Sequence, residues 1–328
     1  MPTRRRFVQM TAAAAVGVLG GKGLEASGPI DLSAARQNGT PQATPGFRGP
    51  ICFFSKHLPM LAARSLGRTV KMLGFDGVDL TVRPKGHIEP ARVAQDLPPF
   101  VEGIRSEGVS VPMITTDLHA DSDPAARPTL ETAAKLEIPY FKPGYYYYKF
   151  SDVRKELEAA ATQLRSLADL AARSGVKLGF HNHSGYVGGL VWDIAPTFGT
   201  LDPTWAGYYF DVRHAVAEGG DAGWRSAFGI VAPRLFMTAI KDFYWEKTPK
   251  GWRQANCPLG DGMVDWKRYF RMLADAKFHG PLSLHLEYDL TGGTPEKLQQ
   301  NIIAAAAQDL AFVKAGLAGA YGASGALR

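Results

Sequence analysis

Residues Ser151–His183, SDVRKELEAAATQLRSLADLAARSGVKLGFHNH, contain one complete helix-to-strand unit. Apolar residues recur at spacings of three and four over positions 152–174, which predicts an amphipathic helix. Ser151 is expected to cap the start of this helix and Gly175 its end. The short apolar run Val176–His181 follows at once and predicts a buried strand. A helix followed closely by a strand is the repeating unit of a parallel sheet.

The same alternation continues on both sides of this unit. A final helix is predicted to begin at Thr294-Pro295, where a capping residue precedes a proline at the first helical position. A doubly wound sheet is the alternative, but Ser55-Lys56-His57-Leu58 follows the first strand in place of a glycine-rich phosphate loop. Eight strand–helix pairs therefore predict an α/β protein with a single (β/α)8, or TIM-barrel, domain over residues 49–316. The predicted strands are Ile51–Ser55, Gly77–Val82, Val109–Thr115, Ile138–Lys142, Val176–His181, Ala206–Asp211, Leu235–Lys241 and Leu282–Glu287.

The composition is that of an ordinary globular chain. Of 328 residues, 45% are hydrophobic and 21% are charged, which is enough apolar material for a large core. Cys52 and Cys257 are the only cysteines and have no CxxC spacing, which excludes a disulfide scaffold and a thiolate zinc site. The net charge is +6, but the first 26 residues hold four basic residues and one acidic residue, so the remainder carries only +3. We therefore expect no nucleic-acid partner.

The N-terminus has the pattern of an export signal. Thr3–Gln9, TRRRFVQ, precedes the apolar stretch Met10–Gly21, and this order resembles a twin-arginine signal peptide. We expect residues 1–26 to be that signal, residues 27–48 a flexible lead-in and residues 317–328 a flexible tail, in a protein exported to the periplasm. A disordered basic N-terminus is the alternative. No later stretch is expected to be long enough to span a membrane, so no stable membrane insertion is predicted.

Polar side chains end almost every predicted strand. Because the carboxyl ends of barrel strands meet at one mouth, these residues are expected to form a polar pocket. In Phe180-His181-Asn182-His183, the alternation of strand side chains places both histidines opposite Phe180, facing the barrel axis. By the same argument Asp211 faces inward, as do Ser283, His285 and Glu287 of the last strand.

These inward groups require a compensating cation. A single inward histidine is usually a hydrogen-bonded core residue, but two histidines, an aspartate and a glutamate together would leave buried charge uncompensated. The cation is either a metal ion or Lys241. Imidazole and carboxylate ligands on separate strands suit one divalent ion, such as manganese, cobalt, magnesium or zinc.

Five short motifs are spread along the predicted barrel: Gly74–Leu80 (GFDGVDL), Leu178–His183 (LGFHNH), Phe210–Ala215 (FDVRHA), Ile240–Asp242 (IKD) and Pro258–Trp266 (PLGDGMVDW). Together, and in this order, they resemble the sugar phosphate isomerase/epimerase family of the xylose isomerase-like TIM-barrel superfamily. The resemblance covers residues from about 50 to 315. It implies the barrel fold and sugar chemistry, and it does not specify the substrate.

The resemblance also implies one divalent metal ion, with His181, Asp211 and Glu287 among its ligands. Members of the family usually carry a further histidine ligand on the seventh strand, two residues before the Lys-Asp pair. This chain has Ala239 at that position. The usual set of four ligands is therefore incomplete.

The missing ligand leaves three possibilities. His183 or His214 replaces it, water fills the vacant position, or the site holds no metal. We expect a metal ion, because the loss of one ligand commonly weakens binding without abolishing it and a catalytic site uses an open position for substrate.

Sugar isomerases of this kind remove the proton beside a polarised carbonyl, which leaves a negative enediolate. On the matching positions, Glu287 is the expected acid/base, His183 the opposing acid/base, and Lys241 the group that polarises the carbonyl. A structural salt bridge from Lys241 to Asp79 or Asp211 is the alternative role. Substrate binding is assigned to Asp79, Arg83, His87, Lys142, His214 and Trp245.

The predicted function is therefore a sugar isomerase or epimerase that acts on a keto-sugar or keto-glycoside. A lyase or hydrolase of 3-keto-glycosides would use the same site, and a non-catalytic sugar-binding protein with a decayed metal site would explain Ala239. The abasic-site endonuclease branch of the superfamily is not expected, since it needs more metal ligands and a basic DNA groove. Export favours an unphosphorylated carbohydrate substrate. A homodimer is one option, because relatives often pair through their barrels.

Overall fold

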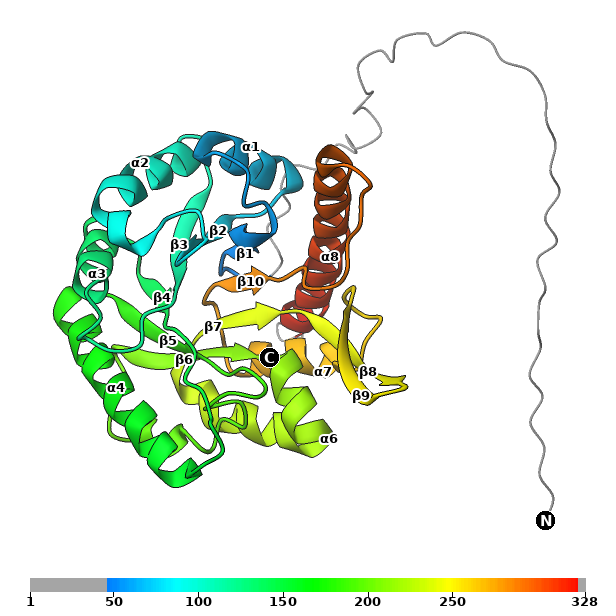
Figure 1. Cartoon of the computed structure of the whole chain (residues 1–328). Helices are drawn as coiled ribbons and strands as arrows, with labels where there is room; N and C mark the ends of the chain where they lie inside the picture. Colours follow the sequence, from blue (N-terminus) through cyan, green and yellow to red (C-terminus); the bar gives the residue numbers. More distant parts are fainter. Residues whose placement is uncertain (1–45, 324–328) are drawn as a thin grey trace, which may run out of the picture. The chain divides into compact units, whose positions relative to one another are not determined.

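The computed structural model describes residues 46–323 and contains a closed barrel of eight parallel strands (Figure 1). Around the barrel, the strands follow the order β1-β10-β7-β6-β5-β4-β3-β2. This confirms the predicted TIM barrel. The strands are β1 (Ile51–Phe54), β2 (Gly77–Val82), β3 (Ser110–Thr116), β4 (Tyr140–Lys142), β5 (Lys177–His181), β6 (Ala206–Asp211), β7 (Leu235–Ile240) and β10 (Leu282–Leu284).

Helices surround the barrel between successive strands. The α-helices are α1 (Ala63–Leu73), α2 (Val93–Arg105), α3 (Ala126–Lys135), α4 (Val153–Ser174), α5 (Ala195–Phe198), α6 (Val212–Val231), α7 (Trp266–Asp275) and α8 (Pro295–Ala323). Single 3-10 turns cover η2 (Ser55–His57), η3 (Pro90–Arg92) and η4 (Ala232–Arg234).

Two details of the predicted elements are wrong. Asp152, and not Ser151, caps α4, because its carboxylate accepts a hydrogen bond from the Lys155 backbone N–H. Gly175 ends the helix in the left-handed conformation, as expected. The eighth strand is shorter than predicted, since regular pairing in β10 stops at Leu284 while β7 and β1 end beside it.

A two-stranded antiparallel hairpin follows β7 directly and was not predicted. It consists of β8 (Asp242–Thr248) and β9 (Gly251–Cys257), with Asp242 paired to Cys257 at its base. Only its base is buried, and the tip carries the exposed Trp252. The segment therefore lacks the apolar run that marked the barrel strands.

The predicted domain boundaries need correction at both ends. Phe47 is buried and packs edge-on against Tyr321, so the flexible lead-in does not extend to residue 48. Helix α8 continues to Ala323 with Leu317 fully buried, so the predicted flexible tail is wrong for residues 317–323. The predicted signal peptide lies outside the described residues.

Helix α8 also bears on the membrane prediction. By length and composition alone, Pro295–Gly322 could cross a membrane, which the sequence analysis did not foresee. A core helix of a soluble protein passes the same test. Ala306, Val313 and Leu317 of this helix are buried in the hydrophobic core, so packing accounts for its apolar face.

Close packing between strands imposes small residues at some positions. A Cβ atom on Gly207 in β6 would lie 2.4 Å from the Arg234 backbone oxygen and 2.8 Å from the Phe236 ring. We expect Gly207→Ala to lower the free energy of unfolding by about 1–3 kcal/mol, because backbone atoms cannot move aside cheaply. Urea unfolding measures the change.

Gly229→Ala is the matched control for this substitution. Gly229 is exposed on α6, and a Cβ atom there would meet nothing within 4 Å. It should leave stability unchanged or raise it by up to about 1 kcal/mol. Equal stability of Gly207→Ala and the wild type would contradict the packing argument.

Candidate functional site

The site lies at the carboxyl ends of β5 and β6, where His181 and Asp211 both point toward the barrel axis. The preceding residue on β5, Phe180, packs on the other side, against Phe198 in the hydrophobic core. Strand alternation therefore places His181 as predicted. Asn182 fixes the junction between the two strands, because its side-chain amide donates to the Asp211 carbonyl at 3.0 Å and accepts from the Asp211 N–H at 2.7 Å.

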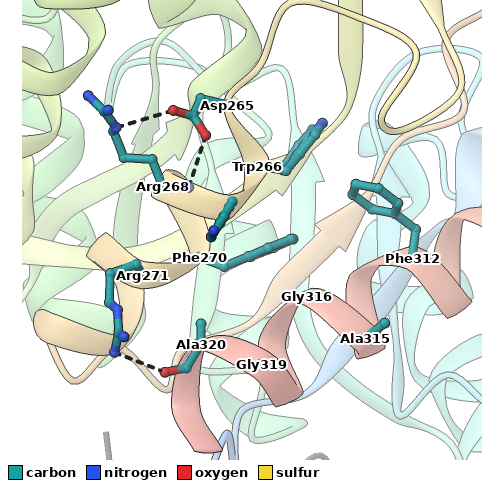
Figure 2. A pocket seen from close by; sticks show the side chains of 11 residues that line it. Asp265, Trp266, Arg268, Phe270, Arg271, Phe312, Ala315, Gly316, Gly319 and Ala320 are labelled. Carbon is teal, nitrogen blue, oxygen red and sulfur yellow. Dashed lines mark hydrogen bonds and ion pairs between the residues drawn. The ribbon is translucent and has the colours of Figure 1, made fainter. Parts of the chain in front are cut away.

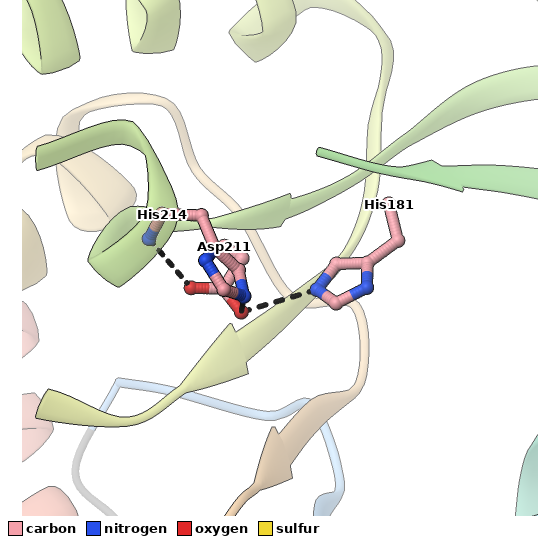
Figure 3. A group of neighbouring side chains, drawn as sticks. All are labelled: His181, Asp211 and His214. Carbon is pink, nitrogen blue, oxygen red and sulfur yellow. Dashed lines mark hydrogen bonds and ion pairs between the residues drawn. The ribbon is translucent and has the colours of Figure 1, made fainter. Parts of the chain in front are cut away.

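Asp211 is the centre of this cluster (Figure 3). Its Oδ2 atom lies 3.1 Å from His181 Nε2, 3.2 Å from Lys241 Nζ and 3.6 Å from His214 Nε2. Its Oδ1 atom accepts from the His214 backbone N–H and so caps α6. Burial alone would raise the pKa of Asp211, but the charge of Lys241 and the neighbouring histidines outweigh it and hold that pKa well below its ordinary value.

The histidines at the mouth are neutral. Burial lowers the pKa of His181 to about 4 and that of His183 to about 3. His183 Nδ1 donates to the Ser184 carbonyl at 2.9 Å, so Nε2 carries the lone pair. Within residues 46–323, that nitrogen has no hydrogen-bond partner. It is therefore placed to accept a proton.

Three groups could hold a divalent metal ion. Donor atoms of His181, Asp211 and His214 all lie within 4.8 Å of one another. His214 Nε2 is buried and has no hydrogen-bond partner among the residues that the structure describes, since Asp211 Oδ2 at 3.6 Å lies beyond hydrogen-bond range. Two imidazoles and one carboxylate are common ligands of manganese, cobalt and zinc, and they leave positions open. The donor set fits a divalent ion.

Glu287, the third predicted metal ligand, lies outside this cluster. Its Oε2 atom is 3.0 Å from Lys241 Nζ, and its Oε1 atom is 2.5 Å from Lys56 Nζ and 3.7 Å from His285 Nδ1. Burial would raise the pKa of Glu287, but these neighbours, Lys241 first, keep it well below its usual range. The carboxylate is therefore ionised and paired with two lysines.

Lys241 joins the two carboxylates. Its ammonium group lies between Asp211 and Glu287, and its side chain is 2% exposed. The structure thus contains the predicted salt bridge to Asp211, and the contacts of Asp79 do not include Lys241. Lys56 was missed, although it directly follows the first predicted strand.

In two of the predicted substrate-binding residues, the polar side-chain atoms already form hydrogen bonds within the protein. Asp79 is fully buried one layer below the mouth, where it accepts hydrogen bonds from Thr115, Ser283 and Tyr209. Both ring nitrogens of His87 lie within hydrogen-bond distance of protein atoms, Thr81 Oγ1 and the Leu58 carbonyl. Neither side chain offers a polar atom to a sugar.

The other predicted substrate-binding residues lie nearer to solvent or to the cluster. Lys142 Nζ lies 3.4 Å from the centre of the Tyr145 ring, and burial lowers the pKa of Lys142 to about 7. The Tyr145 hydroxyl in turn lies 3.0 Å from His181 Nδ1. Arg83 stands over Phe54 at 5.8 Å, and Trp245 is 38% exposed on the hairpin. The contact of the Tyr145 hydroxyl with His181 was not predicted.

Two pockets differ in their relation to this site. One of about 580 Å³ lies under the hairpin and includes Glu287, Gln254 and Asn256 in its wall. Figure 2 shows another, of about 760 Å³, between α7 and α8 in the helical layer, where Trp266 and Phe312 line it. Glu287 is the member of the charged cluster that lines the pocket at the hairpin, and this pocket is the candidate substrate pocket.

Asp242, next to Lys241 in the sequence, has a structural role. Its carboxylate accepts hydrogen bonds from the N–H groups of Phe243, Gly260, Gly262 and Val264 and from the Trp266 indole. The side chain is buried, and it holds the loop 258–266 against the base of the hairpin.

Comparison with known proteins agrees with this geometry. Residues 68–315 match the family described as Xylose isomerase-like TIM barrel. An inosose dehydratase of Clostridium perfringens is 26% identical over 166 residues, which are 47% of this chain and 54% of that protein. The chain thus matches about half the length of this curated relative.

Solved structures share the fold. A xylose isomerase-like TIM barrel protein from Mycobacterium smegmatis, in complex with magnesium, has a TM-score of 0.62 at 16% identity over 83% of this chain and 98% of that one. An apo 3-keto-D-glucoside 4-epimerase from E. coli has a TM-score of 0.60 at 15% identity over 82% of this chain and 100% of that one. At these identities the likeness shows the barrel alone.

The carboxylate of Asp242 generates a stability prediction. Asp242→Asn replaces one acceptor oxygen by an NH2 group that faces N–H donors, so we expect the free energy of unfolding to fall by about 2–3 kcal/mol. Asp265→Asn is the control, because Asp265 caps α7 through the Arg268 backbone N–H, asparagine caps equally well, and the exposed ion pair of Asp265 with the Arg268 side chain contributes little. Similar urea midpoints for both variants would refute the role of Asp242.

The burial of Asp79 generates a pH prediction. Burial raises the pKa of Asp79 to about 6, against the opposing effect of its hydrogen bonds and of Arg83. Because the carboxyl group holds its proton more tightly in the folded than in the unfolded chain, its protonation stabilises the fold. This contribution is fully present below pH 3.8, the pKa of the unfolded chain, and is lost as pH rises through about 6. Relative to Asp79→Asn, the wild type should therefore lose about 2 kcal/mol between about pH 4 and pH 7. A constant difference in unfolding free energy would contradict the shift.

Proposed function

The chain belongs to the xylose isomerase-like TIM-barrel family, and on that premise we propose that it isomerises or epimerises a keto-sugar or keto-glycoside. The reaction would remove the proton beside the carbonyl. One observation carries the proposal: Lys241 lies between the carboxylates of Asp211 and Glu287, and Glu287 lines a pocket of about 580 Å³. A cation among bases is what an enediolate intermediate requires.

Proton transfer is assigned to Glu287 and His183. Glu287 is ionised and borders the pocket, so it can accept the proton beside the carbonyl. His183 is neutral and presents an unpaired Nε2 atom just after β5, which is separated from β10 around the barrel by β6 and β7. Two bases on different sides of a bound sugar allow a proton to leave one face and to return on the other.

Charge stabilisation is assigned to Lys241 and to a divalent ion. The ammonium group of Lys241 can donate to the developing enolate oxygen while it remains paired with Glu287. His181, Asp211 and His214 would hold the ion, which would act as a Lewis acid toward the carbonyl. Manganese, cobalt and zinc suit these ligands better than magnesium, because two of the three are imidazoles.

Substrate recognition is assigned to the rim of the mouth. Arg83 supplies donors for hydroxyl groups and Trp245 offers an exposed ring face for stacking, while Lys142, which is 2% exposed and lies over the Tyr145 ring, would act from beneath the rim. We propose a free keto-sugar or a 3-keto-glycoside, on the argument that an exported enzyme meets few sugar phosphates. The export itself rests on the sequence of residues 1–26 alone.

A lyase is the second candidate function. The curated relative from Clostridium perfringens is a dehydratase, and elimination begins with the same removal of a proton beside a carbonyl. The substituent on the next carbon then leaves as the enediolate collapses. Glu287 and His183 would serve this reaction equally well, and only the fate of the intermediate differs.

Proton NMR in deuterated water tests both candidates. Purified protein, loaded with Mn²⁺ or Co²⁺, is incubated with ketohexoses and with a 3-keto-glucoside. We expect deuterium to enter beside the carbonyl while the substituent is retained, whereas release of the substituent would establish the lyase. Absence of both exchange and release on every substrate would overturn the proposed function.

The variant Glu287→Gln tests whether Glu287 acts as the base, because it keeps the shape of the side chain and removes its ability to accept a proton. It should lower the rate of deuterium entry by about 10²–10⁴-fold, since an amide cannot accept the proton. Glu246→Gln is the matched control. Glu246 forms an ion pair with Arg253 on the hairpin and contacts neither Asp211 nor Glu287 in the described residues. The control variant should react at the wild-type rate.

A further inference from the structure

We propose that the ammonium group of Lys241 is a resident cation of the site and competes with a divalent ion for Asp211. Metal would then bind to His181, Asp211 and His214 only as the ammonium group leaves that carboxylate. The inference rests on the proposed function for the role of the site. Its central claim concerns only the exchange of one cation for another.

The first support is charge compensation. Asp211 is fully buried, and Glu287 is one-fifth exposed. Lys241 contacts both carboxylates, and Lys56 is a second lysine in contact with Glu287. Two negative and two positive groups balance, so the buried carboxylates have their counter-charges within the chain. These four side chains need no divalent ion to balance their charge.

The second support is the shared oxygen atom. Lys241 Nζ and the Nε2 atoms of both histidines approach the same Oδ2 atom of Asp211. Oδ1 is committed to the His214 backbone N–H. An ion bonded to Oδ2 and to the imidazoles would stand directly beside the ammonium group, and like charges at that separation in a buried site exclude one another.

The third support is the proton arrangement. A carboxylate only accepts hydrogen bonds, so His181 Nε2 carries its proton toward Asp211. Metal binding needs that proton on Nδ1, where the Tyr145 hydroxyl at 3.0 Å can accept it. His214 has the same requirement, but its Nδ1 atom accepts from Arg213 Nη1 at 3.0 Å as well as lying 3.0 Å from the Ser184 hydroxyl, so Arg213 would have to turn aside before Nδ1 could carry the proton. The observed pairing is that of the ammonium form, and His181 has a route to the metal form.

The seventh strand explains why the cation comes from the protein. Ala239 pairs with Asp211 in register and is fully buried, so β7 supplies no ligand beside that carboxylate. Two residues further along, on the same side of the strand, Lys241 supplies a charge. In place of a metal ligand, this strand therefore contributes the positive charge of Lys241.

Cobalt titration tests the inference on the full chain. Co²⁺ affinity is measured by calorimetry and by visible absorption for the wild type, Lys241→Met and Lys56→Met. Lys241→Met should bind at least about tenfold more tightly, because it removes the competing charge. Lys56→Met is the control, since Lys56 contacts Glu287 but not Asp211, and its affinity should stay within about twofold of the wild type. Unchanged or weaker binding by Lys241→Met overturns the inference.

A second measurement applies if Lys241→Met does not fold. Wild-type crystals soaked in Mn²⁺ locate the ion by anomalous scattering. We expect Lys241 Nζ to have left hydrogen-bond distance of Asp211 Oδ2 wherever the ion is bound. An ion held by His181 and Asp211 with that contact intact would refute the competition.

The two proposals fail in distinguishable ways. A protein inactive on all keto-sugars whose Lys241→Met variant binds Co²⁺ more tightly would overturn the proposed function and support the inference. An active protein whose metal affinity is indifferent to Lys241→Met would do the reverse.

Discussion

The pairing of Lys241 with the buried carboxylates of Asp211 and Glu287 is the interaction on which the mouth of the barrel depends. A carboxylate removed from water without a counter-charge would take up a proton or destabilise the fold. The lysine, which follows β7, therefore allows two ionised acids to persist at the ends of the strands on either side, β6 and β10. The histidines stay neutral in the same environment because burial penalises their charged form. One constraint thus sets the protonation state of the whole cluster.

Strand alternation explains why much of the site was predictable. The two-residue period directs His181, Asp211 and Lys241 inward once the strands are placed, and motif order supports the barrel independently. His214 was expected to bind substrate or to replace the missing metal ligand, and it reaches the metal-ligand cluster because α6 begins at once after Asp211. The carboxylate that caps the helix then lies three residues from the imidazole. Such helix-start geometry cannot be inferred from strand ends alone.

Depth along the barrel axis was the harder quantity to predict. Asp79 and Lys142 both belong to strands that point polar groups inward, yet Asp79 lies one layer down, among Thr115, Ser283 and Tyr209. Lys142 is also buried, but it lies level with Thr81, two residues beyond Asp79 on β2, and it contacts the Tyr145 ring beside His181. The hairpin was missed for a related reason, since its exposed strands have no apolar run and gain their order from pairing with each other.

Lys241 and Asp242 divide two tasks between adjacent residues. Alternation sends the lysine into the mouth, while the aspartate gathers five donors from the hairpin base and the loop 258–266. These hydrogen bonds anchor the base of the hairpin, whereas the outer part of the hairpin is mostly exposed and is held mainly by pairing between its own two strands. Evolution or engineering can exchange the sequence of that outer part to suit a larger or smaller ligand, and the reactive centre beneath it keeps its alignment.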